Sequence, residues 1–292
     1  MKRLIVTADD FGASLPVNEA IEQAHQNGIL TTASLMVGAA AAPDAAERAK
    51  RMPSLKVGLH VVLVCGRPLL PAGHIPDLVD DQGNFTTQLA RAGINFFFRS
   101  RVRRQLEAEI RAQFAAFRNT GLTLDHVNTH NHMHVHPTVL SLILKVGREY
   151  NVRAVRLPRE PFLSSWRAAR NALPLRLAHS LLLNPLMSLM KWQLKKARVA
   201  HNDYIFGMND TGQMTEQRVL ALLAHLPHGV SEMYFHPALS KWDGMDPGMA
   251  GYACEAEFRA LTSPAIASAL RQYDIQKVSF SDLTEKSASR SA

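Results

Sequence analysis

Short runs rich in β-branched residues alternate along the chain with stretches of helical periodicity, the pattern of repeated βα units. The predicted strands cover residues 3–8, 32–38, 56–64, 122–130, 152–158, 203–208, 230–237 and 275–281. Helical patterns lie between them, as in PVNEAIEQAHQNG, with Pro16 near its start and Gly28 just past its end. About eight strands with helices between them predict an α/β fold of the TIM-like (β/α) barrel type, with room for a distorted or incomplete barrel. A doubly wound open sheet fits less well, because no glycine-rich phosphate loop follows the first strand.

Two segments interrupt this alternation. Residues 65–98 are punctuated by Pro and Gly, and we expect them to frame the mouth of an active site. Residues 159–201 form a helical insertion in which Leu, Met and Trp are mixed with Arg and Lys. We therefore predict a single catalytic barrel domain over residues 1–284 with an insertion at 159–201, followed by a disordered polar tail at 285–292.

Composition narrows the class of protein without indicating a chemistry. The chain has 47% hydrophobic and 20% charged residues, as expected for a soluble protein with a well-formed core. No apolar stretch approaches the roughly 20 residues that span a bilayer, and the N-terminal apolar run is too short for a signal peptide. The two cysteines, Cys65 and Cys254, are far apart and predict reduced thiols. These features together predict a cytoplasmic protein.

Acidic and histidine residues gather near the carboxyl ends of four predicted strands. Asp9 and Asp10 follow the first strand, and His60 lies in the third. His130 follows the fourth strand within the cluster HVNTHNHMHVHP, and His236 ends the seventh. Each alone has an ordinary explanation, such as a helix cap or a hydrogen-bonded core histidine. Since the strand ends of a parallel barrel meet at one rim, their shared position favours a functional site.

The residue types available at this rim indicate metal chemistry. Two imidazoles and one or two carboxylates leave coordination positions open, as catalytic metal sites do. A further carboxylate beside a metal-bound water can act as the general base. Nitrogen ligands favour Zn²⁺ or another transition metal.

Four segments carry a resemblance to a known family. TADDFG, VGLHVVL, THNHMHVHP and YFHPAL resemble, in order and spacing, the YdjC-like carbohydrate deacetylases, also called chitooligosaccharide deacetylases. NEAIEQAHQNGILTTASLMVGA is most similar to the branch associated with hopanoid biosynthesis, HpnK. The resemblance covers essentially the whole chain apart from 159–201. It implies a metal-dependent hydrolase that removes an N-acetyl group from an amino sugar, here the head group of a hopanoid glycolipid.

The resemblance also implies roles for particular residues. It makes Asp10, His60 and His130 the ligands of one divalent metal ion, Mg²⁺ or Zn²⁺. It makes Asp9 the general base, and His236 the acid or the group that stabilises the oxyanion.

Further residues are expected around these ligands. Those predicted to bind substrate or to orient the ligands are His134, His132 and Arg156, with His134 ranked before His132. Asn128 and Asn131 stand where many relatives carry Asp and His. Neither is a presumed ligand, so the metal assignment is unaffected, but the environment of the ligands differs.

The net charge and the composition of the insertion predict which partners the protein binds. The net charge of +8 favours anionic partners. The apolar and basic residues of 159–201 are typical of an interfacial amphipathic segment, so we expect peripheral contact with an anionic membrane, at the inner membrane surface. An ordinary helical hairpin or a dimer contact explains the same composition. We expect no nucleic-acid partner, because no zinc-finger, helix-turn-helix or aromatic RNA-binding pattern is present. The family resemblance implies a homodimer.

Other functions fit parts of the pattern. A deacetylase of soluble chitooligosaccharides would use the same site. A metal phosphoesterase on the same fold would need more ligands, usually His-x-His pairs near the N-terminus, where this chain has Asp9 and Asp10. A non-enzymatic basic protein that binds membranes or nucleic acid would explain the charge but would leave the strand-end residues without a role.

Overall fold

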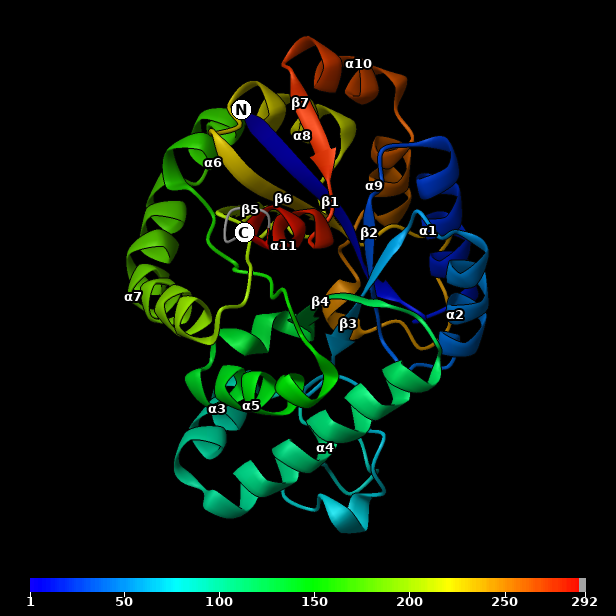
Figure 1. Ribbon diagram of the computed structural model, residues 1–292, viewed down its shortest axis with the longest axis vertical. Helices are drawn as coiled ribbons and strands as arrows, with labels where there is room; N and C mark the ends of the chain where they lie inside the picture. Colours follow the sequence, from blue (N-terminus) through cyan, green and yellow to red (C-terminus); the bar gives the residue numbers. More distant parts are fainter. Residues whose placement is uncertain (289–292) are drawn as a thin grey trace.

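The computed structural model describes residues 1–288, in which seven strands form one sheet with parallel pairing throughout. The strands are β1 (Lys2–Phe11), β2 (Thr32–Leu35), β3 (Lys56–Val61), β4 (Leu124–Thr129), β5 (Tyr204–Phe206), β6 (Gly229–Phe235) and β7 (Ile275–Val278). Their order is β4-β3-β2-β1-β6-β5. Strand β7 lies off this path and pairs with the first half of β1, whereas β2 pairs with its second half. The sheet curls into an open, distorted TIM-like barrel (Figure 1), which confirms the predicted fold class.

Most helices surround the sheet on its outer side, whereas the last helix lies over the middle of the sheet in Figure 1. The longer ones before the insertion are α1 (Leu15–Asn27), α2 (Ala42–Arg51), α3 (Leu89–Phe98), α4 (Ser100–Asn119) and α5 (Pro137–Gly147). After it come α8 (Glu216–Ala224), α9 (Cys254–Leu261), α10 (Pro264–Gln272) and α11 (Ser281–Ala288). Short 3-10 turns are η1 (Ala72–His74), η2 (His130–Val135), η3 (Arg148–Tyr150) and η4 (Pro247–Met249). In Figure 1, α1, α2 and α9 lie on one side of the barrel, and α3, α4 and α5 lie below it.

Local sequence explains where several elements begin. The Ser14 side chain accepts a hydrogen bond from the Val17 N–H at the start of α1, and Pro16 occupies the first turn. The residues of β1 from Leu4 to Phe11 are buried, because helices cover one face of the sheet and the opposite face lines the barrel interior. A large apolar cluster unites the sheet with the surrounding helices, and a smaller one lies around Ile5 and Phe280.

The predicted strand at 152–158 was wrong as a regular strand. Single bridges join Val155 to β4 and Ala154 to Ala200, so the segment lies between β4 and the residues that precede β5 without a continuous ladder. The ladder does not continue because the backbone groups of the following residues have other hydrogen-bond partners or no N–H. Both the N–H and the carbonyl of Leu157 pair with the Asn202 side chain, and Pro158 has no N–H to donate.

The insertion is helical, as predicted, and consists of α6 (Phe162–Ala169) and α7 (Leu173–Ala197). Helix α7 runs along the side of the barrel opposite α1 and α2 (Figure 1). In the described part of the chain, no helix has the length and apolar character needed to cross a membrane. Residues 289–292 of the predicted tail lie outside the described residues, and α11 includes residues 281–288. The division into domain, insertion and tail stays a prediction.

Candidate metal centre and active site

Asp9 and Asp10 both face one cavity, although neighbouring residues of a strand normally point to opposite faces. The backbone explains this. Asp10 has a φ of 62°, and the pairing of β1 with β2 shifts register between Ala8 and Phe11. This left-handed residue interrupts the alternation at the end of β1, so two consecutive carboxylates reach the same space. Such strained backbone is most often retained at functional sites.

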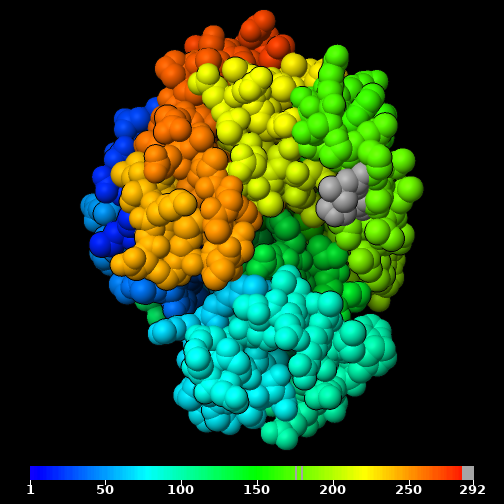
Figure 2. Space-filling view, turned by 180° about the vertical axis from the view of Figure 1, so that it is seen from behind, coloured from blue at the N-terminus to red at the C-terminus, as the bar shows by residue number. Residues whose placement is uncertain are grey.

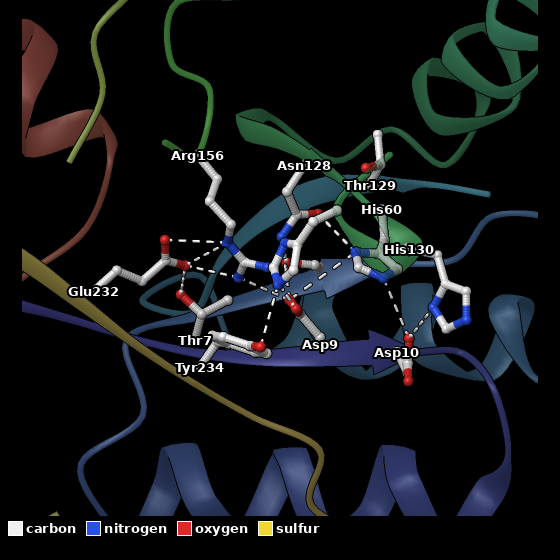
Figure 3. Close-up of polar contacts among 12 residues, drawn as sticks. Thr7, Asp9, Asp10, His60, Asn128, Thr129, His130, Arg156, Glu232 and Tyr234 are labelled. Carbon is white, nitrogen blue, oxygen red and sulfur yellow. Dashed lines mark hydrogen bonds and ion pairs between the residues drawn. The ribbon is translucent and has the colours of Figure 1, made fainter. Parts of the chain in front are cut away.

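Three buried side chains from three strand ends form the candidate metal centre. The Oδ1 atom of Asp10 lies 3.3 Å from His60 Nε2 and 3.2 Å from His130 Nδ1 (Figure 3). One ligand atom from each residue lies within 4.8 Å of the other two, and the described residues contain no other such group of three. The structure thus brings together the three residues predicted to be ligands.

The electrostatics of this cluster fit a cation. Burial disfavours a charged His130, but the Asp10 and Asp246 carboxylates outweigh burial and raise the pKa of His130 to about 10. Burial likewise opposes a charged Asp10, yet His130 and His60 hold its pKa well below the usual range. The cluster therefore stabilises positive charge between its members. Two imidazole nitrogens and a carboxylate oxygen suit Zn²⁺ or another divalent transition metal better than Mg²⁺, which prefers oxygen ligands.

Asp9 is a second ionised carboxylate beside the cluster, 4.0 Å from His60 Nδ1. Arg156 donates to both of its oxygens, at 2.6 and 2.9 Å, and also contacts Glu232 at 2.7 Å (Figure 3). Burial alone would raise the pKa of Asp9, but the Arg156 guanidinium and His60 hold this pKa well below its usual range. Arg156 is fully buried and lies behind Asp9, outside the cavity lining. Its contacts are those of a residue that orients Asp9.

Replacing Arg156 with methionine should destabilise the fold, because Asp9 and Glu232 would then face each other without a cation. Removing one partner of a buried ion pair typically costs about 3–5 kcal/mol of unfolding free energy. The partly exposed Arg111, which pairs with Glu149, is the control, and its replacement by methionine should cost less than about 1 kcal/mol. Urea unfolding of both variants measures the difference, and equal losses would contradict a buried pair.

The catalytic cavity has a volume of about 230 Å³ and is lined by Asp9, Asp10, His60, His130 and residues of five further segments. His236 lies at its wall, and the Nδ1 atom of its ring has no hydrogen-bond partner among the described residues. His132 also lines it, with Nε2 3.2 Å from the Tyr234 hydroxyl. The predicted catalytic His236 therefore shares the cavity with the predicted ligands.

His134 occupies a different place from His132. Its Nδ1 lies 2.7 Å from the Thr129 hydroxyl and its Nε2 lies 3.1 Å from the Arg156 carbonyl oxygen. Burial and the Arg156 charge lower the pKa of His134 to about 3, so the ring is neutral. It is not part of the cavity lining and supports the backbone that carries Arg156. His132 therefore lines the cavity and His134 does not, and the ranking of the two as substrate-binding or orienting residues stays a prediction.

Several site residues had not been predicted. The Asp246 carboxylate approaches His130 Nε2 at 3.6 Å from a loop after β6. Tyr234, Tyr252 and Met208 complete parts of the cavity wall. Tyr234 stands two residues before His236 in a strand, so period-two alternation could have placed it on the same face. Asp246 lies in an irregular segment, which carries no comparable signal, whereas Met208 ends the predicted strand 203–208.

The cavity opens on the face seen in Figure 2. A second cavity of about 650 Å³ adjoins it, sharing Asp10, His130, Asp246 and Met249 with the first. Its remaining walls come mainly from 36–40, 62–87 and 242–249. Figure 2 shows the cyan segment that follows β3 facing the yellow and orange segment that follows β6 across a hollow. This agrees with the expectation that part of 65–98 frames the mouth of the site.

Comparisons with known proteins agree with this geometry. A family model described as YdjC-like protein matches residues 3–272. The chain belongs to the YdjC-like family. It is 32% identical to a carbohydrate deacetylase of Brevibacillus brevis over 96% of this chain and 99% of the relative. It is 30% identical to a carbohydrate deacetylase of Vibrio vulnificus over 96% of each chain. The family resemblance seen in the motifs is confirmed, and the placement in the HpnK branch stays a prediction.

A solved structure shares the architecture of this YdjC-like chain. It is a protein of Enterococcus faecalis named for cellobiose-phosphate cleavage, 25% identical, with a TM-score of 0.74. The alignment covers 97% of this chain and 98% of the other. The fold described above is therefore shared along the full length of both chains.

Proposed function

We propose that this carbohydrate deacetylase of the YdjC-like family removes the acetyl group from an N-acetylated amino sugar by metal-dependent hydrolysis. The observation that carries the proposal is the convergence of Asp10, His60 and His130 in one cavity beside a second ionised carboxylate, Asp9. A divalent ion held by the three ligands, Mg²⁺ or Zn²⁺, would supply Lewis-acid chemistry toward the acetyl carbonyl and the attacking water.

Asp9 is proposed to take the proton from the water that attacks the carbonyl carbon. Its carboxylate borders the cavity next to His60 and is ionised, so it can accept a proton. Arg156 and Asn128 hold its oxygens in place from behind. A base fixed in this way needs no reorientation when substrate enters.

His236 is proposed to act at the other side of the acetyl group, as the acid for the departing amine or as the group that stabilises the oxyanion. Its backbone N–H is already bound by Glu257, so the imidazole is the part available to substrate. An edge contact with Tyr234 and a tilted contact with Tyr252, at centroid distances of 5.5 and 5.0 Å, hold the ring at the cavity wall.

Acetate release tests the proposed activity. The purified protein, supplied with Zn²⁺ or Mg²⁺, would be incubated with an N-acetylglucosaminyl lipid, with chitooligosaccharides and with a phosphoester panel. Acetate release together with the loss of one acetyl group by mass spectrometry supports deacetylation. Phosphate release without acetate would instead establish the phosphoesterase alternative and overturn the proposal.

The finer proposal is that the amino sugar is the head group of a hopanoid glycolipid, bound while the protein lies on an anionic membrane. Helix α7 supports it with a row of exposed apolar side chains, Leu177, Leu181, Leu182, Leu186, Leu189 and Trp192. Its other side packs into the core through Met187, Met190 and Leu194. Basic residues end the helix, at Lys195 and Lys196. Apolar and basic residues together are what a lipid surface binds.

Helix α3 adds to this surface and connects it with the catalytic cavity. Ile94, Phe97 and Phe98 are exposed, and Leu89 at the start of the helix lines the cavity. Helices α3 and α7 both pack against α5, and Figure 1 shows α3 below the lower end of α7. The lipid would bind at the surface formed by α3 and α7, and the sugar linked to it would enter the cavity from that side.

Substituting Leu181, Leu182 and Trp192 with serine should reduce binding to phosphatidylglycerol vesicles by at least about tenfold, because the apolar contact is lost. Vesicle co-sedimentation measures the change. The control is Leu15→Ser on α1, where the side chain is 57% exposed, compared with 72% for Leu182. Unchanged vesicle binding together with a shift from dimer to monomer would identify the surface as the predicted homodimer contact instead.

The larger cavity favours a second candidate substrate, a soluble chitooligosaccharide. Its 650 Å³ and its Trp242 side chain would accommodate further sugar rings beside the one at the ligands. Equal turnover of free oligosaccharide and lipid-linked sugar would favour this candidate.

A further inference from the structure

A chain of buried hydrogen bonds leads from the start of β4 to the metal ligand His60. The Asp125 carboxylate lies 2.9 Å from His126 Nδ1, and His126 Nε2 lies 3.1 Å from the Ser34 hydroxyl. Asn128 Nδ2 donates to Ser34 Oγ at 2.9 Å, and Asn128 Oδ1 lies 2.7 Å from His60 Nδ1. All five residues are buried, so water does not substitute for any member of the chain.

Only one assignment of hydrogens gives every donor in this chain an acceptor. Asp125 accepts from Ser281 on one oxygen, and His126 lies at the other. Burial opposes an ionised Asp125, but the hydrogen bonds from His126 and Ser281 outweigh it and lower its pKa, so it accepts from His126 Nδ1–H. The neutral ring then presents a lone pair on Nε2, to which the Ser34 hydroxyl donates.

The same reasoning fixes the direction of hydrogen-bond donation at Ser34 and Asn128. With its proton given to His126, the Ser34 oxygen accepts from the Asn128 amide nitrogen, which also donates to Asp9 at 3.1 Å. The amide oxygen of Asn128 must therefore face His60, and it can only accept. His60 consequently carries its hydrogen on Nδ1. Its Nε2 lies 3.3 Å from the Asp10 oxygen and is the nitrogen that would bind a metal ion.

Strand geometry places the chain, and packing holds it. His126, Asn128 and His130 alternate along β4 and its end, so they share the face that lines the barrel interior. The His126 ring stacks on Phe280 at a centroid distance of 4.4 Å. On its other side, a Cβ atom at Gly58 would lie 2.5 Å from the ring, so glycine is required there.

We propose that His126, anchored by Asp125, is a positioning residue that acts through Ser34 and Asn128 to fix the tautomer of His60. When one nitrogen of a histidine ligand donates to a fixed acceptor, the ring is held in one orientation. Its other nitrogen is then available to bind the metal. The inference rests on the proposed function only in taking His60 as a metal ligand. It gives a role to a histidine of the 126–136 cluster that lies outside the catalytic cavity.

The test uses the full chain with Zn²⁺ as the probe. His126→Phe keeps a ring between Gly58 and Phe280 but removes the Nε2 acceptor, and should weaken Zn²⁺ binding in calorimetry about 10- to 100-fold. Two-bond ¹H–¹⁵N correlation spectra of the metal-free protein should show His60 protonated on Nδ1 in the unsubstituted chain and a tautomer mixture in the variant. The control is His225→Phe at an exposed position, which should change neither measurement.

Ser34→Ala is a second variant that interrupts the same chain by removing one oxygen, for use if His126→Phe does not fold. It should weaken Zn²⁺ binding to a similar degree, and combining both substitutions should add little, since one chain is cut twice. Unchanged Zn²⁺ affinity and an unchanged His60 tautomer in Ser34→Ala would overturn the inference. Failure of the unsubstituted chain to bind Zn²⁺ would overturn the metal centre itself, and the role of His126 with it.

Discussion

Replacing Asp9 with asparagine should lower kcat for acetate release by a factor of about 10² to 10⁴, the usual contribution of a general base. The amide has the size of the carboxylate but cannot take the proton of the attacking water. Since Asp9 lies outside the group of three ligands, Zn²⁺ should still bind with nearly unchanged affinity. Because Arg156 and His60 hold the pKa of Asp9 well below its usual range, the acid limb of the pH–rate profile should arise from another group.

Asp44→Asn is the matched control for this experiment. Asp44 also pairs with an arginine, Arg48, at 2.8 Å, but belongs to α2 and does not border the catalytic cavity. Its replacement should leave kcat unchanged. Full activity of Asp9→Asn, with metal bound, would show that another group removes the proton.

Replacing His130 with alanine should abolish both metal binding and turnover. The ring supplies one of three ligand atoms, and it also pairs with Asp10 at 3.2 Å and with Asp246 at 3.6 Å. Its loss should weaken Zn²⁺ binding by more than about 100-fold, a larger loss than that of a residue which only orients a ligand. Calorimetry with Zn²⁺ measures the affinity, and acetate release measures turnover.

The two substitutions are most informative as a pair. Asp9→Asn should separate metal binding from turnover, whereas His130→Ala should remove both. His225→Ala, which changes an exposed histidine at the end of α8, should remove neither. Stoichiometric Zn²⁺ binding by His130→Ala with unchanged affinity would exclude His130 as a ligand.

The convergence of the candidate ligands could be predicted because a parallel barrel collects its strand ends at one rim. Asp10 and His130 follow or end strands that the apolar pattern identifies, and His60 lies within another, one residue before the end of β3. The pattern does not give the left-handed backbone at Asp10, which turns two consecutive carboxylates into one cavity. The simple alternation of a strand would have sent Asp9 to the opposite face.

The partners that hold the site in place could not be predicted in the same way. Arg156 was expected to bind substrate or to orient the ligands, but its contacts with Asp9 and Glu232 depend on how its segment pairs with β4, which the sequence does not show. In η2, left-handed residues at Asn131 and His132 break both helical and strand periodicity. Which histidine of the cluster faces the cavity therefore depends on that kink rather than on spacing.

Crystals grown with Zn²⁺ and measured at the zinc absorption edge test the central claim most directly. We expect one anomalous peak in the catalytic cavity, about 2.0–2.2 Å from Asp10 oxygen, His60 Nε2 and a His130 ring nitrogen. Asp9 should lie beside the ion, still paired with Arg156 and without a bond to the metal. A zinc ion bound elsewhere, or one that leaves any of the three residues uncoordinated, would contradict the account.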